Sequence, residues 1–212
     1  MRFLVLAVLC IAECIQAETL VPLSFELPGQ RVVTGLTSFW GRNLEPRSNK
    51  SRPPFLAPEG TTVISRGVAV TASAAPTRGK LAQITDGIKD YGPENAVALP
   101  SGTQYVQLDL GAEKTLYAAL LWHTLDRVNI YFCVVFEISN DPTFTTGVTT
   151  VYNNDDLNEA GLGVGKDKTY FESAEGRLID FKGARARYIR CYSRGNAFRD
   201  TNDYVELEVW GK

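Results

Sequence analysis

The sequence predicts an all-β protein, an antiparallel β-sandwich of the jelly-roll type. About eight short runs of β-branched and aromatic residues lie between clusters of Gly, Pro, Asn and Asp, the pattern of short strands joined by turns. No segment shows a sustained helical period. The chain has 212 residues, of which 44% are hydrophobic and 22% charged, so it has room for one folded domain with additional segments, or for two small domains at most.

The first predicted strands lie before the middle of the chain. Residues 67–73 (GVAVTAS) alternate apolar and polar positions and lead into a turn at APTRGK. Residues 105–111 (YVQLDLG) direct their aliphatic side chains to one face and Gln107 and Asp109 to the other. Residues 116–122 (LYAALLW) are almost wholly apolar, which is typical of a strand buried on both faces.

The remaining predicted strands follow with turn residues between them. They are residues 130–139, 147–153, 177–181, 186–193 and 204–211. In ARYIRCYS the alternation places Tyr188 and Arg190 on one face and Ile189 and Cys191 on the other. One short helical turn is expected earlier, in KLAQITDG.

The chain ends in a strand with an acidic face, YVELEVWGK. The alternation predicts that Val205, Leu207 and Val209 face the core as the last strand of the sandwich. Glu206 and Glu208 then lie on the opposite side.

The N-terminal part of the chain predicts export. Residues 1–17 combine Arg2, a ten-residue apolar region and a small residue at the cut, which indicates a signal peptide and a secreted, periplasmic or cell-surface protein. Residues 18–60 are expected to form an extended, Pro-rich leader, in which prolines prevent regular helix or sheet and Trp40 and Phe55 anchor the segment. The sandwich domain is expected to span 61–212.

Several functional classes are disfavoured by composition. The formal net charge of −2 argues against a nucleic-acid partner, and no further stretch is long enough for a transmembrane segment. One histidine cannot build a zinc cluster or a convincing catalytic triad, so we expect no enzyme. After removal of the signal peptide, Cys133 and Cys191 remain, either as a disulfide or as two buried thiols.

An ordered set of fragments resembles the discoidin-like domain, the galactose-binding-like sandwich of discoidins, coagulation-factor C domains and many bacterial carbohydrate-binding modules. The fragments are GVAVTAS, ITDG, YVQLDLG, LLWH, FEISND, ARYIRCYSRG and YVELEVWG. The middle segment, GVTTVYNNDDLNEAGLGVGKDKTYFES, looks like a bacterial subgroup of such domains found in exported proteins. The resemblance implies a jelly roll that binds ligands through loops at one end.

The resemblance also implies a structural calcium ion. Its usual ligands are the Asp of a DG turn, carbonyl groups near it and a Glu on the last strand, which here are Asp86 and Glu206 together with Gln83, Ile88 and Val205. The alternative is a plain Asp-Gly turn with solvated glutamates. On the metal interpretation, Glu208 is an ordinary solvent-facing residue.

Candidate ligand-binding residues lie at predicted loops and strand ends. His123 and Asp126 belong to LLWHTLDR, at the end of a buried strand, and Asp156 belongs to the polar, Gly-rich loop YNNDDLNEAGLGVG. Arg190 and Arg194 are candidates to bind a ligand oxygen. The alternatives are a histidine bonded to a backbone carbonyl, a solvated loop, and salt bridges from the arginines to loop carboxylates.

The resulting hypothesis is a secreted, non-catalytic module that binds carbohydrate or glycoprotein through these loops. A cell-adhesion or lipid-surface module is the alternative, although the acidic loop argues against membranes. A purely structural role in an envelope or matrix is the third possibility.

Overall fold

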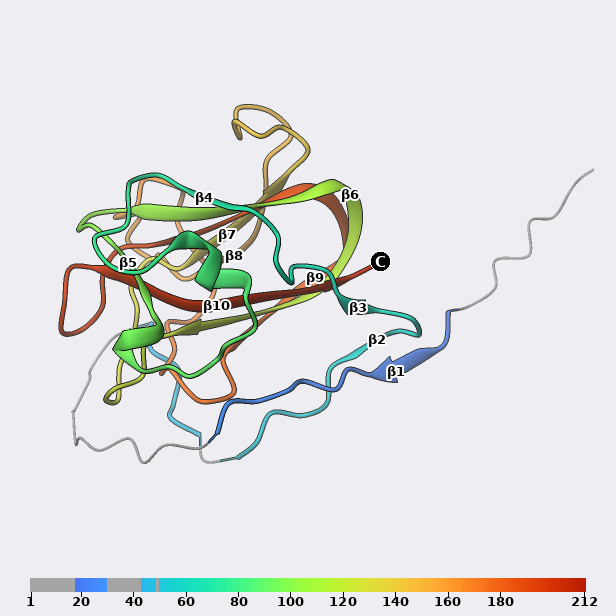
Figure 1. The fold of residues 1–212 in the computed structure, drawn as a ribbon, viewed down its shortest axis with the longest axis horizontal. Coiled ribbons are helices and arrows are strands. Elements are labelled where there is room, and N and C mark those ends of the chain that lie inside the picture. The colour runs from blue at the N-terminus through green and yellow to red at the C-terminus, as the bar shows by residue number, and fades with distance from the viewer. Residues whose placement is uncertain (1–17, 30–42, 49) are drawn as a thin grey trace, which may run out of the picture.

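The computed structural model describes residues 18–29, 43–48 and 50–212, so the predicted signal peptide and Trp40 lie outside the described residues. Within these ranges, ten strands and two short 3-10 helices follow one another (Figure 1). They are β1 (Leu20–Pro22), β2 (Leu56–Pro58), β3 (Thr62–Val63), β4 (Val70–Ala72), η1 (Leu81–Thr85), η2 (Pro93–Asn95), β5 (Val97–Leu99), β6 (Gln104–His123), β7 (Val135–Ser139), β8 (Thr149–Asn153), β9 (Arg177–Ser193) and β10 (Asn202–Gly211). The helix η1 is the short turn predicted in KLAQITDG.

The main strands pair in the order β3-β10-β6-β9-β7-β8, while β4 pairs with β6 and β5 pairs with β10. These pairings are all antiparallel. The predicted fold class, an all-β antiparallel sandwich, is therefore confirmed. The very short strands β3 and β5 carry too few residues for a periodic pattern and were not predicted.

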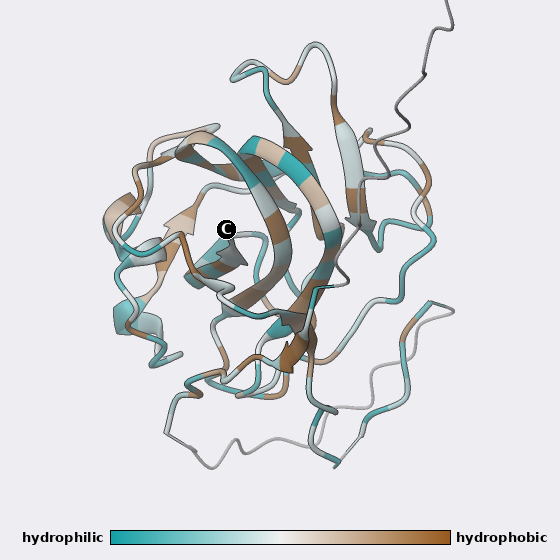
Figure 2. Cartoon of the chain, turned by 90° about the vertical axis from the view of Figure 1, so that its right-hand side faces the viewer, coloured by the Kyte–Doolittle hydropathy of each residue, from teal (hydrophilic) through white to brown (hydrophobic). Residues whose placement is uncertain are grey.

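Two strands are much longer than the sequence indicates. β6 has 20 residues and β9 has 17, and each combines two runs that look like separate strands. Their pairing shifts register between Asp109 and Lys114. Gly111 has φ of 79° and Gly183 has φ of 75°, a left-handed conformation that glycine adopts at little steric cost. Both strands therefore bend without ending, and they curve from one layer of the sandwich into the other (Figure 2).

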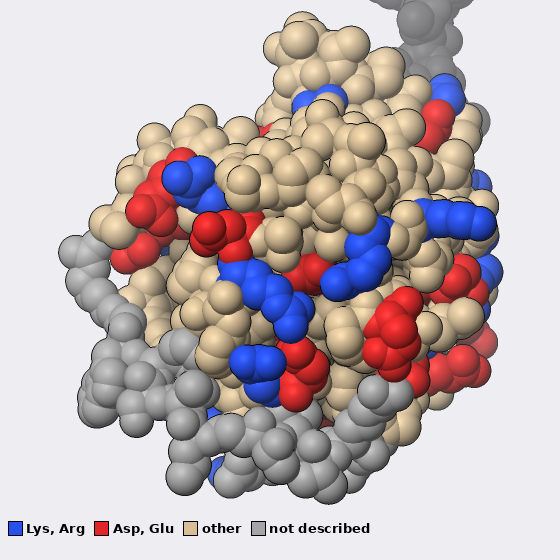
Figure 3. All heavy atoms as spheres, turned by 60° about the vertical axis from the view of Figure 1, so that its left-hand side comes forward, with Lys and Arg blue, Asp and Glu red and all other residues tan. Residues whose placement is uncertain are grey.

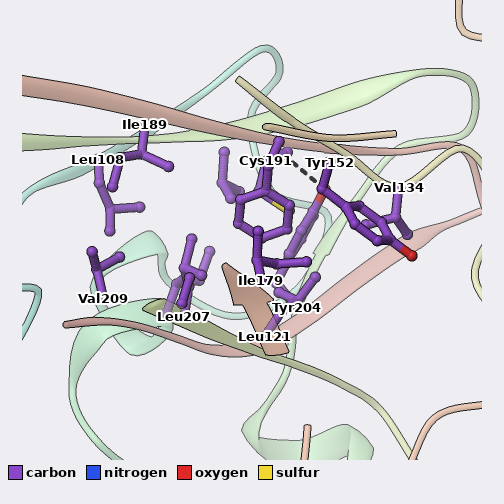
Figure 4. Close-up of a cluster of buried hydrophobic side chains, with 14 of the residues drawn as sticks. Leu108, Leu121, Val134, Tyr152, Ile179, Ile189, Cys191, Tyr204, Leu207 and Val209 are labelled. Atoms are coloured by element: carbon purple, nitrogen blue, oxygen red, sulfur yellow. Dashed lines mark hydrogen bonds between the residues drawn. The ribbon is translucent and has the colours of Figure 1, made fainter. Parts of the chain in front are cut away.

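The core lies between the two layers. Leu108 and Ile189 of one layer face Leu207 and Val209 of the other (Figure 4). All four side chains are fully buried, together with Cys191 of β9. Burial of each large aliphatic side chain contributes roughly 1.5–3 kcal/mol. Ile189 and Cys191 share the inward face, as the predicted alternation in 186–193 requires, and the predicted inward positions of Leu207 and Val209 are confirmed.

Val205 is an exception to the predicted alternation. The pairing of β10 with β6 shifts register between Tyr204 and Glu206, so the strand contains a bulge at this point. Val205 consequently leaves the core and joins an outer cluster on the far side of the layer; this outer cluster comprises Tyr91, Ala96, Leu120, Trp122, Leu125 and Val205. The prediction that Val205 faces the core is wrong for this reason.

Residues 18–29 together with 43–48 and 50–60, here called the N-terminal arm, pack on the outside of the sandwich. Leu23 and Ala57 are buried against Ala118 of β6, and Phe55 packs on the same cluster. The arm also contains regular structure, because β1 pairs with β2. The expectation that prolines exclude any sheet here is wrong: the two strands have three residues each, and prolines occupy strand ends.

Cys133 and Cys191 are buried as free thiols, so of the two alternatives for this pair the thiols are found. Cys133 has φ of 50°, which interrupts extended backbone. For this reason the strand predicted over 130–139 begins only at Val135.

Candidate functional site

His123 lies beneath the surface rather than at a loop mouth. Its Nδ1 atom is 2.7 Å from Oε1 of Glu172, and both side chains are almost completely buried. The imidazole stacks on the ring of Tyr131 with 3.9 Å between centroids. The backbone-carbonyl alternative is also not found, because the partner of Nδ1 is a carboxylate. His123 therefore fixes the position of neighbouring segments, and its side chain does not reach a ligand at the surface.

Arg190 lies on the outer face of the layer that contains β7 and β8. Its guanidinium is held between two aromatic rings, 4.2 Å from the centroid of Tyr105 and 4.1 Å from that of Phe144. Its Nε donates to Oε1 of Gln107 at 2.6 Å. These contacts hold the loop after β7 against the sheet, so Arg190 is separated from the loops that carry Asp126 and Arg194.

The salt bridges expected between arginines and loop carboxylates have other partners. Arg187 pairs with Asp109 at 2.7 Å and Arg185 pairs with Glu113 at 2.6 Å, both across β9 and β6. On the side of the molecule that Figure 3 brings forward, charged side chains of opposite sign likewise stand next to one another. The register of β6 and β9 brings these partners together. Arg185 lies opposite Thr115, two residues after Glu113, and Arg187 is next to Tyr188, which lies opposite Asp109.

Three loops meet at the end of the sandwich beyond His123. Residues 130–132 and 194–197 are joined by backbone hydrogen bonds, including one from the amide of Arg194 to the carbonyl of Phe132 at 2.9 Å. The third loop, 153–165, is attached where the amide of Val134 donates to Oδ1 of Asn154 at 2.7 Å. Side chains on these loops are thereby held at one end of the molecule.

An aromatic ring and several charged side chains at this end come from residues that flank two of these loops. Arg199 pairs with Asp126 at 3.0 Å, and the guanidinium of Arg127 lies 4.9 Å from the ring centroid of Phe198. Phe198 is 40% exposed. We call Asp126, Arg127, Arg194, Phe198 and Arg199 the end-loop surface. The sequence analysis identified Asp126 and Arg194 but missed Phe198 and Arg199. The signal that could have indicated them is the turn sequence GNAFRD, in which both residues lie.

The turn that presents Phe198 is closed by side-chain hydrogen bonds. Oδ1 of Asn196 accepts the amides of Phe198 at 3.0 Å and Arg199 at 3.1 Å. Asp156, the other predicted ligand residue, is half-buried on the third loop, which its neighbour Asp155 closes by accepting two backbone amides. The structure therefore brings Asp126, Asp156 and Arg194 to one end, with His123 below and Arg190 elsewhere.

The predicted metal ligands Asp86 and Glu206 lie close together. Oε2 of Glu206 accepts the amide of Gly87 at 3.0 Å. Its other oxygen, Oε1, is buried and has no hydrogen-bond partner among the described residues. Burial raises the pKa of Glu206 to about 8, and the nearby carboxylates of Glu208 and Asp86 act in the same direction.

Glu208 is buried, so the prediction that it faces solvent is wrong. It is 1% exposed and pairs with the ammonium of Lys89 at 2.8 Å. The guanidinium of Arg66 is a second partner at 3.5 Å. The segment after η1 folds over this side of β10, and the sequence pattern of the strand alone does not reveal that cover.

No family model and no curated protein matches the chain. Among solved structures, a family 89 glycoside hydrolase from Clostridium perfringens, determined with GlcNAc-α-1,4-galactose, matches 71% of this chain and 14% of its own with 18% identity and a TM-score of 0.53. A chitosan-binding module of a chitosanase/glucanase from Paenibacillus sp. IK-5 matches 71% of this chain and 99% of its own with 20% identity and a TM-score of 0.51.

These likenesses show the fold, and they confirm the antiparallel β-sandwich expected from the sequence. The match to the hydrolase covers only a small part of that much longer chain. In the part of the chain that the structure describes, no helix is long and apolar enough to cross a bilayer.

Proposed function

We propose that the protein is a secreted, non-catalytic carbohydrate-binding module that binds saccharide through the end-loop surface. The observation that carries the proposal is the convergence of an exposed aromatic ring, Phe198, with the charged groups of Asp126 and Arg199 at one end of the sandwich. A carbohydrate site needs an apolar platform and a few converging polar groups. The similar fold of a chitosan-binding module adds support.

Each group of the end-loop surface has a chemical role in this proposal. The exposed part of the Phe198 ring takes the C–H face of a sugar ring, while Arg127 covers another part of the aromatic surface. The carboxylate of Asp126 accepts from hydroxyl groups, and Arg194 and Arg199 donate to ring or hydroxyl oxygens. The ordered turn around Phe198 reduces the entropy lost on binding.

A binding role rather than catalysis is supported by the state of the only histidine. The imidazole of His123 is buried and engaged with Glu172, so it does not stand beside an exposed nucleophile. The end-loop surface itself offers an aromatic ring, arginines and one carboxylate that already pairs with Arg199. These groups suit recognition and hold no evident general base.

Replacement of Phe198 by Ala is expected to weaken saccharide binding by roughly 30-fold, because removal of a central aromatic contact costs about 2 kcal/mol. A glycan array followed by calorimetry on the best ligand measures the effect. Phe144→Ala is the matched control, since Phe144 stacks on Arg190 away from the end loops. If no glycan binds the parent protein, or if both variants bind equally well, the proposed function is wrong.

Structural calcium is the second part of the proposal. The donor set fits: the buried Oε1 of Glu206 lacks a partner within the described ranges of the chain, and the carboxylate of nearby Asp86 is exposed. Asp86 and Glu206 would hold the ion with carbonyl groups of Gln83, Ile88 and Val205. The guanidinium of Arg66 donates to the carbonyl of Asp86 at 3.2 Å, but its side chain is 49% exposed and has room to move. The ion would supply a positive charge to Glu206 and tie the turn to β10.

Calcium at about one hundred times its dissociation constant is expected to raise the melting temperature by roughly 5–10 °C relative to EDTA, since it adds about 2.7 kcal/mol to the folded state. The increment should vanish in Glu206→Ala and persist in Glu208→Ala, although the latter starts from a lower melting temperature. Differential scanning calorimetry gives both values. A parent protein with the same melting temperature in calcium and EDTA removes the calcium proposal.

A further inference from the structure

A groove of about 1030 Å³ lies beneath the N-terminal arm. One wall consists of arm residues 45–48 and 50–53, and the other of residues 170–178. Leu125 and Val128 contribute apolar surface between them. A hollow of this size is at the upper end of what ligand sites in proteins enclose. None of the groups assigned to the end-loop surface or to the calcium proposal lines it.

The arm wall of the groove is fastened at both ends. At one end, Leu44 pairs with Thr169, and the amide of Glu45 donates to the carbonyl of Thr169 at 2.9 Å. At the other end, the guanidinium of Arg52 donates to the carbonyl groups of Glu175 and Gly176, each at 3.0 Å. The groove is therefore a built feature of the fold, with both walls held in place by hydrogen bonds.

The acidic side chains that line the groove are already engaged within the protein. Glu45 pairs with Arg177 at 3.1 Å, and the carboxylate of Glu175 accepts the backbone amide of Arg52 at 3.1 Å. The third, Glu172, is the partner of the buried His123. These carboxylates are consequently poor candidates to attract a further cation.

The basic side chains of the groove are in excess. Arg47, Lys50, Arg52 and Arg177 all line it, although the whole chain has a formal net charge of −2. Nε of Arg177 is buried and lacks an acceptor among the residues that the structure describes. Burial lowers the pKa of Arg52; the carboxylate of Glu175 acts in the opposite direction, and the neighbouring Arg177 lowers the pKa further. The groove is lined by four basic and three acidic side chains, and the exposed Arg47 and Lys50 have no ion-pair partner among the described residues.

We infer that this groove is a second binding site, for an anionic oligosaccharide that carries carboxylate or sulfate groups. Arginine is suited to such groups because its planar guanidinium donates to two of their oxygens at once. The exposed Arg47 and Lys50 stand at the rim, where they attract the anion, and the apolar groups between the walls contact the C–H faces of the sugar rings. This site does not require saccharide binding at the end-loop surface.

The test uses the full chain and three oligosaccharides of equal length: oligogalacturonate, a chondroitin sulfate fragment and a neutral cello-oligosaccharide. Calorimetry is expected to show binding of one or both anionic ligands, and at least tenfold weaker binding in the double variant Arg47→Glu/Lys50→Glu. The control Lys182→Glu/Arg185→Glu changes the net charge equally on the exposed surface of β9 and should retain parental affinity.

The outcomes separate this inference from the proposed function. Phe198→Ala should leave binding of the anionic ligand unchanged, whereas the arm variant should leave any glycan of the end-loop surface unaffected. Absence of binding by both anionic oligosaccharides overturns the second site. Equal weakening in the arm variant and its control overturns it as well, because the attraction would then depend only on net charge.

Discussion

In metal-free buffer, the free energy of unfolding is expected to fall as the pH rises from about 4.5 to about 8, and Glu206→Gln is expected to remove most of this fall. Burial holds the pKa of Glu206 at about 8, against an ordinary value of 4.5. The folded protein therefore keeps a proton that the unfolded chain loses. A raised pKa gives stability that is complete below about 4.5 and lost as the pH passes through about 8.

The size of this effect is on the order of 5 kcal/mol, at 1.36 kcal/mol for each pH unit between the two pKa values. Urea denaturation in EDTA at pH 5, 6.5 and 8.5 measures it. Glu206→Gln keeps an acceptor for the amide of Gly87 and has no carboxyl to ionise, so the variant should exceed the parent in stability at pH 8.5 and match it near pH 5.

Glu113→Gln is the control for the pH series. Glu113 is exposed and hydrogen-bonds Arg185, which lowers the pKa of its carboxyl, so it stays ionised throughout the window. Its replacement should leave the pH dependence unchanged. A parent protein whose stability does not vary between pH 5 and 8.5 would show that Glu206 is solvated or compensated in solution.

The sequence predicts those features of the fold that depend on the residue pattern within a single strand. The alternation in 105–111 and the apolar run of 116–122 depend on which side chains face the core, and each strand carries that pattern itself. The continuity of β6 could not be read in this way, because Gly111 looks like the end of a strand and is a bend within one. The bulge before Glu206, which turns Val205 outward, leaves no mark in the alternating letters.

The candidate sites were harder to predict because their partners are distant in the chain. His123 stands 49 residues before Glu172, and nothing near either residue indicates that they form a buried pair. The end-loop surface was found in part, since Asp126 follows a strand directly. The aromatic group of this surface, Phe198, lies beside Arg127 because backbone hydrogen bonds connect the loop of Phe198 to residues 130–132. The groove beneath the arm could not be predicted, because one of its walls is formed by a segment that the sequence indicates only as an extended leader.

Glu208→Ala is expected to lower the free energy of unfolding by about 3–5 kcal/mol at neutral pH, the cost of removing one partner from a buried ion pair. The ammonium of Lys89 is 2.8 Å from Glu208, and both side chains are buried. Lys89 retains one hydrogen bond, to the carbonyl of Glu26 at 2.7 Å, and the ring of Trp122 near it. Those contacts do not neutralise the charge of Lys89. The variant therefore leaves the ammonium of Lys89 buried without a carboxylate, and the half-exposed Arg66, the other partner of Glu208, is a second positive charge nearby.

A double-mutant cycle separates the cost of the orphaned charge from the value of the pair itself. Glu208→Leu combined with Lys89→Met should recover most of the stability lost in Glu208→Leu alone, because an apolar pair of similar volume avoids desolvation of both charges. Asp109→Ala, which breaks the exposed pair with Arg187, should cost no more than about 1 kcal/mol and serves as the contrast.

If Glu208→Leu and Asp109→Ala lower the free energy of unfolding equally in urea denaturation, water reaches Lys89 in solution and the segment after η1 does not seal this side of β10. If the double variant is instead as unstable as Glu208→Leu, the pair contributes specific contacts beyond its charge.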